Sequence, residues 1–145
     1  MFEKTMNGES RLAAWRNFRT NYDISQGPEG ILEAFADVKV TPRYIDYWTP
    51  KDWPNVFEIV SDGYLCQSGL TLVITATLHH FNFINSTEIR LEAISNFETG
   101  TDGLILIQEN LCYNFTPGQI IPLAHAHENC TRFVSHIITA DKLFT

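Results

Sequence analysis

The 145-residue sequence predicts an α+β domain, with helices in the first half of the chain and an antiparallel sheet in the second. Up to about position 37, large apolar side chains recur every three or four residues, which is the helical period. From position 88 onward, short apolar or alternating segments are separated by turn residues, as in antiparallel strands. Between these two parts, a long apolar segment begins at Cys66.

Two helices are predicted near the beginning of the chain. Residues 9 to 22 form the first, because Trp15 and three other large apolar side chains fall on one stripe. Ser10 is its predicted N-cap. A break at Gly27-Pro28 leads to the second helix, predicted from Glu29 to Asp37.

An aromatic loop is predicted from residue 38 to residue 54, a segment with three prolines. We expect its large aromatic side chains to lie against apolar surface and to form an interaction surface for a partner protein. They are Tyr44, Tyr47, Trp48 and Trp53. Pro54 suits the first turn of a third helix, predicted from 54 to 61 and ended by Asp62-Gly63.

Residues 66 to 81 are predicted to form a buried central helix. Their many β-branched side chains favour a strand, but sixteen residues is long for a strand. Cys66 would then stand at the helix N-terminus, among unpaired N–H groups and at the positive end of the helix dipole. Both features favour a thiolate, so a nucleophilic cysteine is expected at such a place.

The remaining segments predict an antiparallel sheet. The predicted strands are Glu88 to Ile94, Leu104 to Gln108, Leu111 to Phe115, Gln119 to Ile121 and Phe133 to Thr139. The second and third are joined by Glu109-Asn110, which predicts a hairpin. The length predicts a single domain over 1–145, with a helical part (1–40), the aromatic loop and a short helix (41–65), and the central helix with the sheet (66–145).

Composition excludes several function classes. The net charge is −7 with only ten basic residues, so no nucleic-acid partner is expected. The longest apolar run, Leu70 to Leu78, is far shorter than the roughly 20 residues of a membrane span, so no membrane partner is expected. The first residues lack the apolar core of a signal peptide, which predicts a cytoplasmic origin.

No cofactor and no metal site are predicted. The three cysteines form no CxxC pair, which argues against zinc and against a disulfide framework. His125 and His127 would share one face if that segment were a strand, and they are the weak candidates for metal ligands. Solvated histidines are the default interpretation. The carboxylates of Glu88, Glu92 and Glu98 are predicted to lie on a strand face or in a loop, without an acid–base role.

The stretch from Trp53 to Cys66, with Asp62-Gly63 before the cysteine, resembles the bacterial transglutaminase-like cysteine proteinases. In that family a Trp-x-Thr-Pro-x-x-Glu segment leads to Gly-x-Gly-Asp-Cys-Glu-Asp, a helix and a Leu-Arg-Leu strand, and the next strand opens with the catalytic histidine. The resemblance covers about residues 48 to 121 and implies a papain-like fold. It places Cys66 at the nucleophile's position and Asn114 at that of the third catalytic member.

Three parts of the chain depart from this pattern. Leu65 stands where the family has an acidic residue, Gln67-Ser68 stands where it has an acidic pair, and Asp102-Gly103 stands where it has the catalytic histidine. A thiolate nucleophile needs a base within hydrogen-bond reach. His79 and His80 lie about 20 Å from Cys66 along the predicted helix, at roughly 1.5 Å per residue.

The sequence therefore predicts a non-catalytic papain/transglutaminase-like domain that acts as a structural or protein-interaction subunit. Its partners would be proteins, in a homo- or hetero-oligomer, and a virion or another large assembly is one setting. The alternative is a cysteine peptidase, amidase or acyl-transferase with Cys66 as nucleophile and Asn114 orienting a histidine. A third reading is a module that binds a small ligand beneath the aromatic loop.

Overall fold

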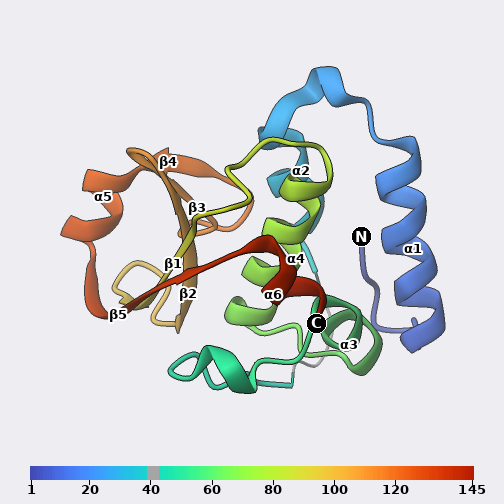
Figure 1. Cartoon of the computed structure of the whole chain (residues 1–145), viewed down its shortest axis with the longest axis horizontal. Helices are drawn as coiled ribbons and strands as arrows, with labels where there is room; N and C mark the ends of the chain where they lie inside the picture. The colour runs from blue at the N-terminus through green and yellow to red at the C-terminus, as the bar shows by residue number, and fades with distance from the viewer. Residues whose placement is uncertain (39–42) are drawn as a thin grey trace.

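The computed structural model describes residues 1–38 and 43–145 and confirms the predicted α+β fold. Helices pack on a five-stranded antiparallel sheet with strand order β4-β3-β2-β1-β5 (Figure 1). The strands are β1 (Ile89–Asn96), β2 (Asp102–Gln108), β3 (Leu111–Tyr113), β4 (Ile120–Pro122) and β5 (Cys130–Ile138). The part of the predicted loop at 39–42, and the predicted division between 40 and 41, lie outside the described residues.

The helices of the described chain are of very different lengths. They are α1 (Gly8–Asn21), α2 (Gly27–Phe35), α3 (Val56–Asp62), α4 (Gln67–His80), α5 (Leu123–Glu128) and α6 (Ala140–Phe144), with the 3-10 turns η1 (Ile24–Gln26) and η2 (Pro50–Asp52). The four longest match the predicted helices to within two residues. Neither α5 nor α6 is predicted from the sequence.

The helix caps differ from the predicted ones. Asn7, not Ser10, caps α1: its side chain accepts a hydrogen bond from the Ser10 N–H, and the Ser10 hydroxyl accepts one from the Asn7 N–H. Asn55 caps α3 in the same way, so this helix begins at Val56 rather than at Pro54. The helix ends at Asp62-Gly63, as predicted, and Gly63 has the left-handed conformation.

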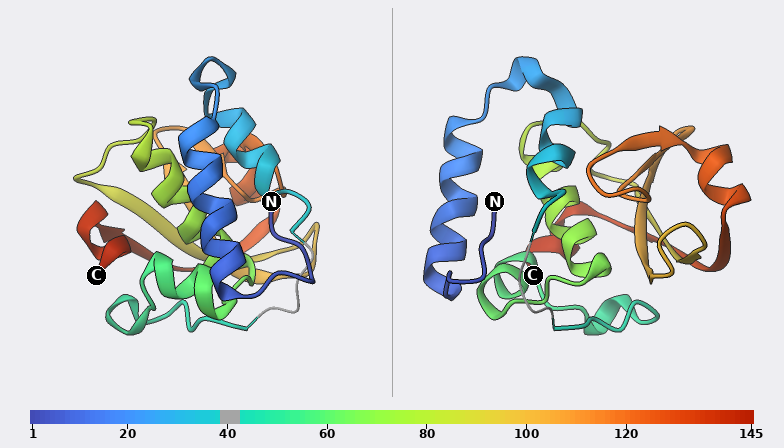
Figure 2. Two further views of the ribbon diagram at one scale, coloured as in Figure 1. Left: turned by 90° about the vertical axis from the view of Figure 1, so that its right-hand side faces the viewer. Right: turned by 180° about the vertical axis from the view of Figure 1, so that it is seen from behind.

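The central helix α4 lies between the sheet and the other long helices (Figure 2). It is buried on almost every side, and its three buried threonines each have a backbone acceptor. Thr71 donates to the Leu104 carbonyl, Thr75 to the Thr71 carbonyl and Thr77 to the Val73 carbonyl. These bonds satisfy the hydroxyls, so a segment rich in β-branched residues is stable as a buried helix.

Each face of the sheet is covered. On the face toward α4, apolar side chains of β1 and β2 join the main core, which also contains Trp15 and residues of α2 and α3. The opposite face carries a second, smaller core beneath α5. Its buried members are Ile94, Ile105, Ile107, Cys112, Phe115, Ala126 and Cys130. The two cores follow from the alternation of side chains along β1 and β2.

The strand assignments hold with corrections at their ends. The predicted hairpin is present, because β2 and β3 pair antiparallel. β5 begins at Cys130 rather than at Phe133, and Thr139 is the N-cap of α6 rather than part of the strand. Among the described residues, no helix combines the length and the apolar character needed to cross a bilayer.

Candidate functional site

Cys66 is the N-cap of α4, as the sequence predicts. Its Sγ accepts a hydrogen bond from the Gly69 N–H at 3.5 Å, and the residue is 9% exposed. Gly69 is required at this point because the Tyr64 carbonyl occupies the space of a β-carbon. The chain thus passes directly from the end of α3 over the first turn of α4, and this close approach fixes the position of the thiol.

The beginning of β2 lies against the first turn of α4. The Ser68 hydroxyl accepts a hydrogen bond from the Leu104 N–H at 3.2 Å. Gly103 faces Gln67, and a β-carbon at position 103 would lie 2.7 Å from the Gln67 Cγ. Because of these contacts between β2 and the first turn of α4, Asp102, the first residue of β2, lines the same cavity as Cys66.

This cavity has a volume of about 660 Å³, which is within the usual range for ligand sites. Its described lining residues are Val38, Tyr44, Ile45, Tyr47, Leu65, Cys66, Gln67, Ser68, Leu70, Gly100, Thr101 and Asp102. Burial raises the pKa of Tyr47, and the nearby Asp102 carboxylate raises it further. The Tyr47 hydroxyl is therefore neutral at pH 7 and able to donate a hydrogen bond.

Asn114 is buried where the sheet packs against α4. Its Nδ2 donates to the Thr71 hydroxyl at 2.9 Å, and its backbone carbonyl accepts a hydrogen bond from Gln67 Nε2 at 2.6 Å. The backbone has a φ of 70°, a conformation that asparagine tolerates better than most residues. No imidazole of the described chain is hydrogen-bonded to this amide.

No imidazole of the described chain is hydrogen-bonded to Cys66. His79 Nδ1 hydrogen-bonds with the Ser86 hydroxyl, and His80 packs edge-on against Phe81. His136 Nε2 donates to the Tyr47 carbonyl at 2.9 Å. His125 and His127 bond to carboxylates on the other side of the sheet. None of these contacts supplies a base to the thiol.

His125 and His127 lie on α5 rather than on a strand, which corrects the geometry assumed for a metal pair. Residues two apart on a helix point in different directions. His125 bonds to Glu98 at 3.2 Å, and His127 bonds to Glu92 at 2.9 Å. Within 1–38 and 43–145, no three His, Cys, Asp or Glu side chains come together as a metal-binding group.

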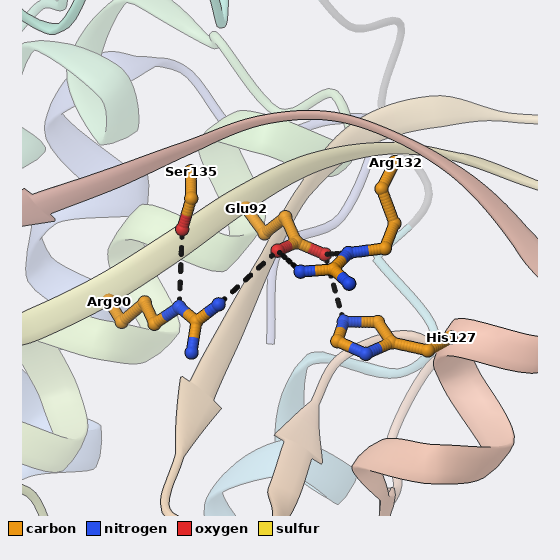
Figure 3. A network of polar contacts seen from close by, with 5 residues as sticks. All are labelled: Arg90, Glu92, His127, Arg132 and Ser135. Atoms are coloured by element: carbon orange, nitrogen blue, oxygen red, sulfur yellow. Dashed lines mark hydrogen bonds and ion pairs between the residues drawn. The ribbon is translucent and has the colours of Figure 1, made fainter.

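Glu92 is the centre of an ion cluster that the sequence does not reveal (Figure 3). Its side chain is 2% exposed, and Arg132 donates to its two oxygens from Nε and Nη2, each at 3.0 Å. His127 donates to one oxygen, and Arg90 lies 3.7 Å from the other. Glu92 thus lies on a strand face, as predicted, but the side chains of His127 on α5 and of Arg132 on β5 bond to it, and its burial is not predicted.

The aromatic residues of the loop divide into surface and core. Tyr44 is 79% and Trp48 is 53% exposed, and Trp48 stacks on Phe133 of β5 with a centroid distance of 5.6 Å. Tyr47 is half-buried and also stacks on Phe133. The prediction that Trp53 belongs to the interaction surface is wrong, because Trp53 is buried and its Nε1–H donates to the Asp46 carbonyl. We call Tyr44, Tyr47, Trp48 and Phe133 the aromatic patch.

Neither a protein-family model nor a curated protein sequence matches this chain. Among solved structures, the chain is similar to LapG of Legionella pneumophila. Calcium-bound LapG gives a TM-score of 0.63 at 15% identity, over 94% of this chain and 82% of LapG. LapG itself and its EGTA-treated form each give a TM-score of 0.64 at 14% identity, over 92% of this chain and 80% and 77% of theirs.

LapG is a bacterial transglutaminase-like cysteine proteinase, so the fold of this chain is papain/transglutaminase-like. At this level of identity, the similarity concerns the fold alone. The resemblance stated from the residues is therefore confirmed at the level of the fold.

Proposed function

We propose that this chain is a transglutaminase-like domain without cysteine-protease activity and acts as a structural or protein-interaction subunit. One observation carries the proposal. The residue that shares the cavity with Cys66 at the start of β2 is Asp102, and no imidazole of the described chain is hydrogen-bonded to the Cys66 sulfur, which accepts from the Gly69 N–H. An imidazole would accept the thiol proton and then stabilise the thiolate as its cation. A carboxylate gives the anion no such partner.

The contacts of Cys66 support the same conclusion. Its sulfur accepts the Gly69 N–H and so satisfies one of the free donors at the beginning of α4. This contact gives the cysteine a role in folding that needs no reactivity. Asn114 likewise has a structural role, through Thr71 and Gln67.

The aromatic patch supports the interaction role. Tyr44 and Trp48 present large apolar area to solvent beside a well-packed core, and such area often marks a contact site for another protein. The kind of assembly, a homo- or hetero-oligomer in the cytoplasm or in a virion, stays a prediction from the sequence.

Alkylation of the thiols tests the absence of catalysis. The folded protein is treated with iodoacetamide between about pH 5 and pH 8, and mass spectrometry follows each cysteine separately. We expect slow labelling of Cys66 at pH 6, comparable to that of Cys112 and Cys130. Fast labelling of Cys66 alone at pH 6, together with an amidase activity lost on alkylation, would contradict the proposal.

A pair of variants at position 102 sharpens this test. Asp102→His places an imidazole on the cavity that Cys66 lines, and Asp102→Asn is the matched control without a base. We expect faster alkylation of Cys66 near neutral pH in the histidine variant only. Equal rates in wild type, Asp102→His and Asp102→Asn would show that the missing histidine does not limit the reactivity of this thiol.

A cysteine peptidase, amidase or acyl-transferase is the second candidate function. The observation that favours it is the position of Cys66, at a helix N-terminus and on a cavity of about 660 Å³. The alkylation experiment decides between the two candidates, because only the enzyme requires a thiolate near neutral pH.

A further inference from the structure

The cavity beside Cys66 has a distinctive chemical lining. Its walls include apolar side chains and the rings of Tyr44 and Tyr47, and its one acidic member among the described residues is Asp102. Among the lining residues that the structure describes, none is lysine or arginine. The net charge of −7 gives the whole protein the same sign as this carboxylate.

We propose that this cavity binds a lysine or arginine side chain carried by an extended segment of a partner protein. The proposal rests on the interaction role proposed above and names the chemistry of the partner at that site. The Asp102 carboxylate pairs with the charged end of the side chain, and the aliphatic stem packs on Ile45 and Leu70.

The tyrosines add a second attraction for a cation. A guanidinium or ammonium group over an aromatic face is drawn to the negative centre of the ring. Tyr44 is 79% exposed, so its ring is accessible from solvent at the edge of the cavity. The chain already shows this contact with a tyrosine, because the Arg43 guanidinium lies 4.3 Å from the centre of the Tyr64 ring.

The N-terminus of α4 fits the backbone of the partner rather than its side chain. Free N–H groups at a helix N-terminus attract partial negative charge, such as the carbonyl oxygens of an extended peptide. The Gly69 N–H is already bonded to Cys66, which lowers the number of free donors. A glutamate side chain would meet this terminus but would also be repelled by Asp102.

Peptide titration followed by NMR tests the proposal. The probes are acetyl-Gly-Ala-X-Ala-Gly-amide peptides, in which X is arginine, its neutral isostere citrulline, or glutamate. We expect the arginine peptide to shift the backbone amide signals of Gln67, Thr101 and Asp102. We expect the citrulline peptide to bind about five-fold more weakly, which is the usual size of a partly exposed ionic and cation–π contact.

Two variants provide the controls. Asp102→Asn keeps the size of the side chain and should remove the preference for arginine over citrulline. Tyr44→Leu should weaken the binding of the arginine peptide about three-fold while leaving the amide spectrum of the fold unchanged. Equal affinity for arginine and citrulline, tighter binding of glutamate, or an absence of shifts at these amides would overturn the proposal.

The outcome is separable from that of the proposed function. Fast alkylation of Cys66 with an amidase activity would refute the non-catalytic role, and an arginine preference would then describe substrate specificity. An inert Cys66 with no preference for arginine would refute the cation site alone.

Discussion

The ion cluster around Glu92 allows a test of how burial of one ionic partner affects the free energy of unfolding when either partner is substituted. The Glu92 side chain is 2% exposed, whereas Arg132 is 49% and Arg90 is 41% exposed. Glu92→Gln removes the buried charge and releases two arginines that water can solvate. Arg132→Met does the opposite, because it leaves a buried carboxylate with His127 and the more distant Arg90.

The magnitudes follow from these contacts. Arg132 donates two hydrogen bonds of 3.0 Å to the carboxylate, and each charged bond is worth about 1.5–3 kcal/mol when both partners are buried. Solvent screening of the half-exposed guanidinium reduces this value. We expect Glu92→Gln to cost about 1–2 kcal/mol and Arg132→Met to cost about 3 kcal/mol, because a buried charge without its partner is expensive.

Urea denaturation at pH 7, followed by tryptophan fluorescence and circular dichroism, measures both free energies of unfolding. Glu98→Gln is the matched control. It removes a carboxylate that bonds to His125, but both side chains are about half exposed, so a change below about 0.5 kcal/mol is expected. A loss for Glu92→Gln as large as that for Arg132→Met would refute the reasoning from burial.

Three further substitutions probe the core and the site. Gly69→Ala should cost at least about 3 kcal/mol in thermal unfolding, because its β-carbon would clash with the Tyr64 carbonyl. Trp15→Phe should cost about 2 kcal/mol, because the hydrogen bond from its Nε1 to Thr77 is lost and the ring is smaller. Burial raises the pKa of Cys112 from 9.0 to about 12. The unfolded chain therefore ionises this thiol first, and the free energy of unfolding should fall by about 1 kcal/mol between pH 9 and pH 10. Urea titrations at both pH values should show a smaller fall for Cys112→Ala, and an equal fall would contradict this assignment.

The central helix shows what the sequence determines well. Its length and the position of Cys66 predict α4, although the side chains have strand propensity. The structure explains why length prevails: the buried hydroxyls of Thr71, Thr75 and Thr77 have backbone acceptors within the helix or on β2. Local patterns predict such an element because its length and the apolar character along it can be read from the sequence.

The features that the sequence does not reveal depend on contacts between distant residues. α5 is six residues long and buries only Ala126, so its sequence has no periodic apolar stripe that would predict a helix. Glu92 is buried among side chains of α5 and β5, and its main partner, Arg132, lies forty positions away. The alternation along β1 places Glu92 on the face opposite Leu91, but it does not tell whether that face meets water.

The candidate site was predictable in part. The position of Cys66 follows from its place at the start of a long apolar segment, and the place of Asp102-Gly103 at the beginning of a buried strand is also visible in the sequence. The burial of Trp53 is not, because an aromatic residue in a proline-rich loop has the same local pattern whether it is exposed or packed. The contribution of Phe133 to the aromatic patch also needs the fold, since it lies on β5, far along the chain.

Both borders of the sheet are built in ways that discourage another chain from joining it as an extra strand. At one border, β4 spans three residues and ends in Pro122, which has no N–H to offer. At the other border, the pairing of β1 steps from Val134 to Arg132, so Phe133 forms a bulge that interrupts the ladder. Both features hinder edge-to-edge pairing of this sheet with another chain.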